Sequence, residues 1–162
     1  MLTVFFLSFL IVITTVPFSK ILINDNQNTF YSYSKELIFG IVFLTFIALL
    51  LNFFIELNIY VTSTVLLISL TFLIKFRNCY FNKTFIVFSI LQSIFITTLI
   101  LESNVYRPDA GLYHLPFISL LNESKIIIGS VNINFRFGTT SIIQYLSAIQ
   151  NNYLFDIKFI SI

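Results

Sequence analysis

LIFGIVFLTFIALLLNFFI, residues 37–55, carries no charged side chain and lies between Glu36 and Glu56. As a helix this run would be about 28 Å long at 1.5 Å per residue, which nearly crosses a hydrocarbon core of about 30 Å. Lipid offers no water to the backbone, so a long run without polar alternation favours a helix, which satisfies its own N–H and C=O groups. The run therefore predicts a transmembrane helix.

Three more runs of similar length lack charge in the same way: Met1–Ser19, Leu57–Ile74 and Thr84–Leu101. A single central Lys or Asp costs about 2.5–3.5 kcal/mol on the insertion scale, so four uncharged runs indicate a lipid environment. The composition agrees, with 57% hydrophobic and 10% charged residues and a mean hydropathy of +0.95. The first run has no basic start and no small-residue cleavage site, so it predicts a retained helix and not a signal peptide.

The charge balance and the cysteine content exclude several classes of protein. The net charge is +2 and no basic block occurs, which excludes nucleic acid and leaves the lipid bilayer as the predicted partner. The single cysteine, Cys79, excludes an intrachain disulfide and any cysteine-rich metal site.

Lys and Arg are distributed unevenly between the two sides of the predicted bundle. Loops 20–36 and 75–83 carry five of them, whereas the N-terminus, the 56–58 turn and the 103–138 loop together carry three. Because cytoplasmic loops are enriched in Lys and Arg, the five-charge side is predicted to be cytoplasmic. The 103–138 loop is then external.

The predicted fold is an all-α, multi-pass transmembrane protein in three parts. Residues 1–102 form a four-helix transmembrane region, residues 103–138 form an external loop, and residues 139–162 form a partial fifth helix. The last part is apolar but contains several Asn and Gln side chains. We therefore expect this fifth helix to be truncated.

The external loop, SNVYRPDAGLYHLPFISLLNESKIIIGSVNINFRFG, contains the only histidine and several charged residues. Residues 107–111 have turn chemistry, because Pro presets φ and Gly permits a positive φ. Residues 112–122 then predict an amphipathic helix in the plane of the membrane interface. Leu112, Leu115 and Ile118 form its predicted apolar face.

Asp109 and His114 each have two interpretations. Asp109 is either a general base or metal ligand at the membrane surface, or a residue that forms the turn and caps the next helix. His114 either binds a phosphate or shuttles a proton, or it is a packing residue. The two residues lack the spacing of paired helical ligands, so the sequence identifies no metal.

Arg107, Arg136 and Tyr113 complete the candidate site. The two guanidinium groups could clamp a phosphate through bidentate hydrogen bonds, or they could contact lipid head groups by snorkelling. Tyr113 suits the aromatic belt of a membrane interface.

Two blocks in this region, PDAGLYHLP at residues 108–116 and NFRFG at residues 134–138, carry a resemblance. They resemble a family of uncharacterised multi-spanning bacterial membrane proteins with Asp-x-Gly-Leu-Tyr-His and Arg-Phe-Gly blocks. More distantly, the loop resembles the first external loop of C-type glycosyltransferases, integral membrane enzymes that use polyprenyl-phosphate sugars. The resemblance covers roughly residues 103–150.

This resemblance implies a glycosyltransferase-like protein of the bacterial inner membrane, or the N-terminal fragment of one, that acts in the assembly of cell-envelope glycans. Asp109 matches the loop acid of those enzymes, which takes the acceptor's proton or holds a divalent metal. We assign the polyprenyl-phosphate sugar donor to Tyr113 and His114, and its phosphate to Arg107 and Arg136, whose charges would neutralise it.

The alternative is a non-enzymatic protein, either a transporter or flippase segment or a scaffold subunit. Transporters place ionisable groups inside their membrane spans, whereas the four predicted spans contain none. This favours surface chemistry in the loop, and it leaves a scaffold open.

The predicted topology can be tested through Cys79. A membrane-impermeant maleimide should not label this thiol in intact cells, because loop 75–83 lies on the five-charge side. Labelling should appear only after the membrane is broken, which also shows that the thiol can react. Efficient labelling before lysis would reverse the predicted orientation.

Overall fold

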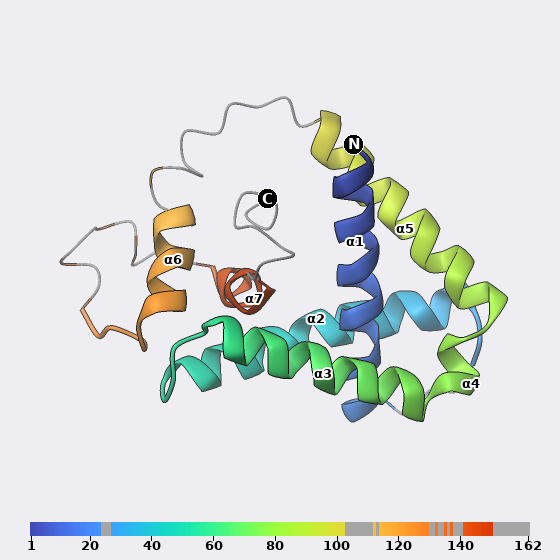
Figure 1. Cartoon of the computed structure of the whole chain (residues 1–162), viewed down its shortest axis with the longest axis horizontal. Helices are drawn as coiled ribbons and strands as arrows, with labels where there is room; N and C mark the ends of the chain where they lie inside the picture. The colour runs from blue at the N-terminus through green and yellow to red at the C-terminus, as the bar shows by residue number, and fades with distance from the viewer. Residues whose placement is uncertain are drawn as a thin grey trace. The chain divides into compact units, whose positions relative to one another are not determined.

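The computed structural model describes residues 1–23, 27–102, 112, 114–129, 132, 135, 137 and 141–150. Its regular elements in this part of the chain are all helices, which confirms the all-α prediction (Figure 1). They are α1 (Leu2–Thr15), the 3₁₀ helix η1 (Val16–Ile21), α2 (Phe30–Asn52), α3 (Ile59–Lys75), α4 (Arg77–Tyr80), α5 (Lys83–Glu102), α6 (Leu115–Glu123) and α7 (Ile143–Gln150).

Three stretches of the described chain are long and apolar enough to cross a membrane: Leu2–Ile21, Phe30–Asn52 and Lys83–Glu102. The remaining predicted span, Leu57–Ile74, corresponds to α3, which is equally uncharged inside but has only 17 residues. The sequence therefore located four apolar helices, of which three have the length of a span.

Helix α2 begins seven residues before the apolar run that predicted it, at Phe30 instead of Leu37. Thr29 explains the early start, because its Oγ1 accepts a hydrogen bond from the Ser32 N–H at 3.2 Å and so satisfies one amide of the first turn. A helix end depends on such caps and not on hydropathy. As a result, Lys35 and Glu36 lie on the helix and not in a loop.

The contacts divide the chain into two compact units. Unit 1 contains Met1–Leu44 and Leu66–Asn104, and unit 2 contains Thr45–Val65 and Val105–Ile162, the latter described only in the part given above. Helices α2 and α3 each contribute residues to both units.

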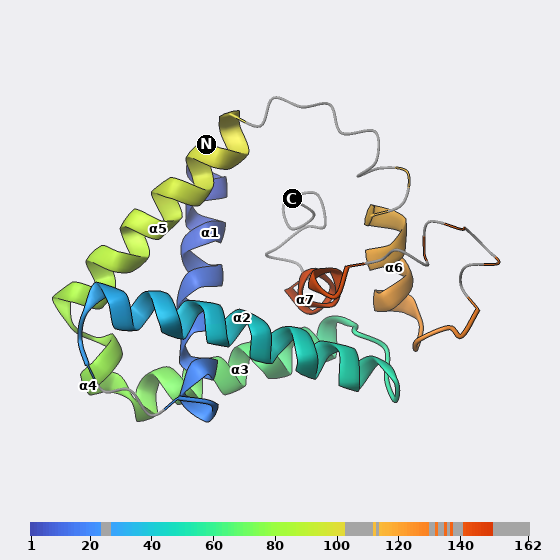
Figure 2. The same ribbon diagram turned by 180° about the vertical axis from the view of Figure 1, so that it is seen from behind.

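In unit 1, α1 lies against α5 (Figures 1 and 2). The core of this unit is rich in aromatic side chains from α2, α4 and α5. The Tyr33 and Phe85 rings pack edge to face at 5.2 Å, and the Tyr80 ring lies 5.1 Å from the same phenylalanine. Such edge contacts add to the free energy gained by burying the rings.

Gly40 marks a close approach inside unit 1. A Cβ at this position would overlap the carbonyl oxygen of Thr15, at the end of α1. Small residues allow helix backbones to approach closely, which is how apolar helices associate in lipid. Here the missing side chain lets α2 pass over the end of α1.

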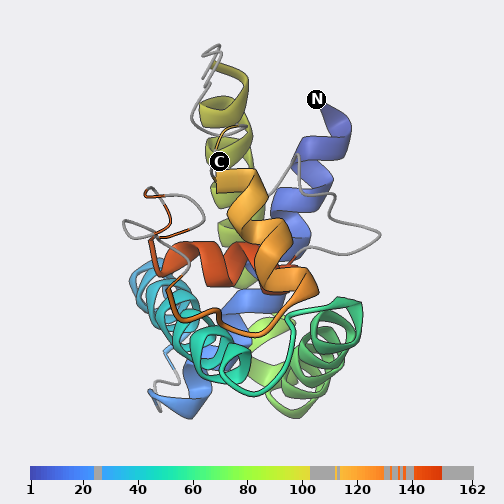
Figure 3. The same ribbon diagram turned by 90° about the vertical axis from the view of Figure 1, so that its left-hand side faces the viewer.

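In unit 2, α6 lies against α7 (Figure 3). The predicted helix over residues 112–122 corresponds to α6, which has Pro116 in its first turn. Its buried face consists of Phe117, Ile118 and Leu121. Of the three residues of the predicted membrane-facing side, Ile118 is buried within unit 2, Leu115 is partly buried and Leu112, before α6, is 62% exposed. Their insertion into the membrane interface stays a prediction.

Helix α7 is the described part of the predicted fifth helix. It has eight residues, and five of them are buried, including Gln144 and Tyr145. Residues 139–140 and 151–162 lie outside the described part.

Replacing Gly40 with alanine should destabilise unit 1 despite the higher helix propensity of alanine. The added methyl group would force α2 away from Thr15, and overpacking of this kind costs about 1–3 kcal/mol. We expect a lower midpoint of thermal unfolding in detergent. Val42→Leu, at a 43% exposed position of the same helix, is the matched control. A Gly40→Ala midpoint equal to or above that of the wild type would contradict the close approach.

Candidate functional site

Only one of the five predicted site residues, His114, lies in the described part of the chain. Arg107, Asp109, Tyr113 and Arg136 are outside it. The described geometry therefore concerns His114 and the elements of unit 2 that hold it.

His114 stands at the N-terminal end of α6, and its ring is partly buried. The ring nitrogen Nδ1 contacts the amide nitrogen Nε2 of Gln144 on α7. An amide N–H can donate to Nδ1 only when the neutral imidazole carries its proton on Nε2. Gln144 thus links the start of α6 to α7.

Gln144 is a candidate site residue that the sequence analysis did not select. Its side chain is only 5% exposed, and its Oε1 has no hydrogen-bond partner among the described residues. Buried amide oxygens are nearly always hydrogen-bonded, so this atom is an available acceptor near the start of α6. The one signal was a glutamine in an otherwise apolar run, which was interpreted as weakening a membrane span.

Asn52, the last residue of α2, is fully buried in unit 2. Its Nδ2 donates to the carbonyl oxygens of Leu121 at 3.4 Å and Ser124 at 3.1 Å, and its own carbonyl oxygen accepts from the Ile126 N–H at 3.0 Å. These side-chain partners can only accept, which fixes the orientation of the amide. Asn52 therefore joins the end of α2 to the end of α6.

A second asparagine extends this connection. Asn122 Nδ2 donates to the carbonyl oxygens of Leu57 at 2.5 Å and Ala148 at 2.8 Å. The Leu57 N–H in turn donates to the carbonyl oxygen of Leu121 at 3.0 Å. The 56–58 turn, α6 and α7 are thereby held together in unit 2.

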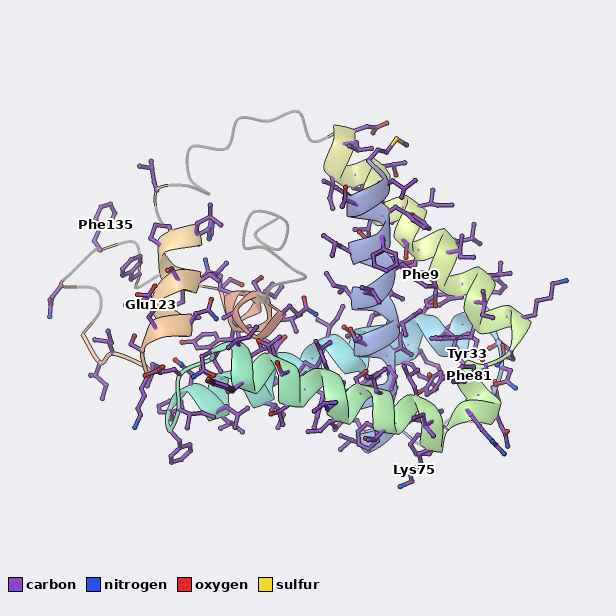
Figure 4. The ribbon with its side chains drawn as sticks, in the orientation of Figure 1. Phe9, Tyr33, Lys75, Phe81, Glu123 and Phe135 are labelled. Atoms are coloured by element: carbon purple, nitrogen blue, oxygen red, sulfur yellow. The ribbon has the colours of Figure 1, made fainter. Side chains whose placement is uncertain are left out.

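Unit 2 also contains a cavity of about 180 Å³ beside α6. Most of its lining residues are apolar, with Phe53, Phe117 and Ile126–Ile128 among them, but polar groups contribute nearly half of the lining surface, and Lys125 is the one charged lining residue. Tyr145 contributes a phenol, and burial raises its pKa, so the group stays a neutral O–H donor near neutral pH. Figure 4 shows the neighbouring Glu123 at the end of α6.

Unit 1 contains a buried ion pair. Lys20 Nζ lies 2.7 Å from Glu36 Oε1, and the two side chains are 3% and 1% exposed. Tyr80 on α4 donates its O–H to Glu36 Oε2 at 3.2 Å. Burial, and next the charge of Glu36, raise the pKa of Tyr80 above its usual value of 10.0. The phenol therefore remains a donor to the carboxylate.

Sequence analysis placed Lys20 and Glu36 at the edges of apolar runs and did not pair them. Their opposite charges at the facing ends of two consecutive runs were the available signal. Lys20 belongs to the Leu2–Ile21 stretch and Glu36 to α2, so both lie within candidate spans. Ionisable groups in such positions are paired and are common at functional sites.

A nearby polar network surrounds Tyr33, labelled in Figure 4. Its O–H donates to the carbonyl oxygen of Cys79 at 2.7 Å and accepts from Asn82 Nδ2 at 2.7 Å. Asn82 Oδ1 caps α5 by accepting from the Phe85 N–H at 2.8 Å. Asn82 and Asn122 each begin an Asn-x-Ser/Thr triplet, and both amides are engaged within the fold.

The described residues contain no group of three His, Cys, Asp or Glu side chains that could hold a metal ion. Asp109, the predicted metal ligand, lies outside that part of the chain. The predicted divalent metal therefore stays a prediction.

Replacing Glu36 with glutamine should strongly destabilise unit 1. The substitution removes the negative charge beside the buried Lys20 ammonium, and breaking a buried pair in this way typically costs about 3–5 kcal/mol. We expect a markedly lower unfolding midpoint in detergent. The double variant Lys20→Met/Glu36→Leu should recover most of the loss, because no charge then stays buried. A Glu36→Gln protein as stable as the wild type would show that the pair contributes no stability.

The similarity to a known protein family extends over the whole length of the chain. Residues 1–162 match a family model described as "Domain of unknown function (DUF8201)". No curated protein matches the chain. No solved structure matches it either. The expectation of an uncharacterised family is thus confirmed, and the chain belongs to the DUF8201 family, a domain of unknown function.

Proposed function

We propose that this protein is an integral membrane protein whose long apolar helices cross a bilayer. The observation that carries the proposal is the outward apolar surface of these helices. In an apolar segment of 18 residues within α2, only 28% is buried inside the protein, and the same share is buried in the corresponding segment of α5. Exposed residues include Phe46 at 54% and Phe95 at 57%. A helix that is apolar on all sides is expected in lipid or in a large core.

Hydrogen bonding in unit 2 supports one element of the topology. The 56–58 turn is bonded to α6 through Leu57 and Asn122. The connection after the second predicted span and the 103–138 loop then belong to the same face of the membrane, as the alternation of spans requires. The placement of this face outside the cytoplasm, in a bacterial inner membrane, rests on the Lys and Arg distribution.

For the reaction, we propose glycosyl transfer from a polyprenyl-phosphate sugar. The acceptor hydroxyl oxygen would attack the anomeric carbon, and the bond from that carbon to the phosphate oxygen would break. The hydroxyl proton would pass to Asp109, and the electron pair would leave with the phosphate. Arg107 and Arg136 would neutralise the departing charge, and a divalent metal held by Asp109 could serve the same purpose.

His114 supports this proposal from the described part of the chain. Its contact with Gln144 fixes the start of α6, four residues after Gly111 ends the predicted turn at Asp109. The unpartnered Gln144 Oε1 is a fixed acceptor of the kind that orients a sugar hydroxyl. Tyr113, adjacent to His114 in sequence, completes the proposed donor site.

The buried pair of Lys20 and Glu36 favours a second candidate, a transporter or flippase segment. Both residues lie in candidate spans, where transporters place the ionisable groups of their pathways. The two candidates differ in the residues that they require. Transport depends on the ion pair, and glycosyl transfer depends on the loop.

Asp109→Asn in the complete protein should reduce glycosyl transfer about 10²–10⁴-fold, the usual effect of removing a general base. Asparagine keeps the size of aspartate and most of its ability to form a turn. The measurement is the incorporation of radiolabel from polyprenyl-phosphate hexoses into membrane glycans, at equal protein abundance. Glu123→Gln, at an exposed position of α6, is the control and should keep full incorporation.

Normal incorporation by Asp109→Asn would leave this residue as a turn former and would remove the basis for an enzyme. If Lys20→Met/Glu36→Leu abolished solute or lipid movement in that case, the transporter would be the better description. If Asp109→Asn were the only variant to lose incorporation, the transporter would be excluded.

A further inference from the structure

Two apolar turns lie next to each other in unit 2. The first follows α2 and contains Phe53, Phe54 and Ile55, which are 52%, 72% and 42% exposed. The second follows α6 and contains Ile127 and Ile128, which are 38% and 96% exposed. Five large apolar side chains on two connected turns form an exposed patch, and such patches mark interaction sites.

Asn52 holds the two turns in register. Its side chain donates to Ile55 at the first turn and to Ser124 at the second, and its backbone accepts from Ile126. Gly129, with a φ of +85°, ends the second turn in a conformation that glycine adopts without strain. The backbone of both turns is therefore held by a buried amide, and the second turn ends at a glycine.

The cavity of about 180 Å³ opens between these turns. Phe53 lines it from the first turn and Ile126–Ile128 from the second, while Phe117 and Tyr145 line it from α6 and α7. Its volume suits part of one hydrocarbon chain. Lys125 also lines it and is exposed, and no carboxylate is among the lining residues. A cavity that combines apolar side chains with a polar part holding one cation fits a ligand that has a hydrocarbon chain and a negative head.

We propose that this cavity binds an acyl chain of an acidic phospholipid of the surrounding bilayer, with Lys125 paired to the lipid phosphate. The inference rests on the proposed membrane location, because α2 ends at Asn52 and the two turns then lie at the level of the head groups. The exposed side chains of both turns insert among the acyl chains. The aliphatic stem of Lys125 lies along this apolar surface while its ammonium group stays among the phosphates.

The test uses an inserted tryptophan, since the chain contains none. Ile128→Trp in the full chain is reconstituted into vesicles of phosphatidylcholine and phosphatidylglycerol, with bromine on the acyl chains of one lipid or the other. Brominated phosphatidylglycerol should quench this tryptophan about fivefold more strongly, per lipid, than brominated phosphatidylcholine, the preference expected of one lysine at an anionic surface. Lys125→Gln should abolish the preference. Phe54→Trp provides a second reporter if Ile128→Trp misfolds.

Two control tryptophans separate the possible failures. Phe46→Trp, in α2, should be quenched by both lipids, and Glu123→Trp, exposed on α6, should be quenched by neither. Quenching at residue 46 without quenching at residues 54 and 128 would overturn the lipid site and leave the membrane proposal intact. An absence of quenching at residues 46, 54 and 128 would overturn both.

The identity of the lipid is tested in the same system. Equal quenching by the two brominated lipids, unaffected by Lys125→Gln, would overturn the proposal that the bound lipid has an acidic headgroup. Added polyprenyl phosphate should not remove the preference for phosphatidylglycerol. If a small mole fraction of polyprenyl phosphate removed this preference, the ligand would be the isoprenoid phosphate, and the assignment to a bulk phospholipid would be wrong.

Discussion

The amide of Asn52 is the interaction on which the arrangement of unit 2 depends. It ends α2, is fully buried, and donates to carbonyl groups near the ends of α2 and α6. Buried carbonyl groups need hydrogen-bond partners, and the last carbonyls of a helix have none within the helix. One side chain that satisfies the ends of two helices therefore fixes their relative position. Asn52 acts together with Asn122, which bonds the 56–58 turn and α7, and with Gly129, which ends the second apolar turn.

In unit 1 the buried polar contact between helices is an ion pair, whereas in unit 2 such contacts are made by amide side chains. Lys20, Glu36 and Tyr80 bury a cation, an anion and a phenol among aromatic side chains. Removing two charges from water is costly, and their attraction rarely exceeds that cost by much. The pair therefore specifies how η1 and α2 meet more than it adds stability. Gly40, one helical turn after Glu36, has a related role, because it lets α2 approach Thr15.

The proposed chemistry concentrates in the 103–138 loop, of which the structure describes α6 and a few flanking residues. His114 and Gln144 are the described members of the proposed site, and they join α6 to α7. An acid on the adjoining turn would begin from a fixed support, and general-base catalysis depends on such positioning. The lipid site proposed beside Lys125 would anchor the same helix at its other end. A loop fixed at both ends of α6 is suited to act on a substrate that itself lies in the membrane.

The sequence by itself determined the all-α class and the location of the apolar helices, because a run without charge is a local property of the chain. It also predicted a helix within the 103–138 loop, which corresponds to α6. It misplaced the beginning of α2, which depends on the Thr29 cap. Four predicted site residues lie outside the described part, so their roles remain predictions.

Only the tertiary structure decided which polar residues meet. Lys20 pairs with Glu36 across 16 positions, Gln144 contacts His114 across 30, and Asn52 reaches Ser124 across 72. In the sequence, each of these polar side chains interrupts an apolar run or stands outside one. A buried polar group needs a hydrogen-bond partner, but the sequence alone does not show which residue that partner is. The partner is chosen by the packing of the helices, which brings distant segments within the 3 Å that a hydrogen bond requires.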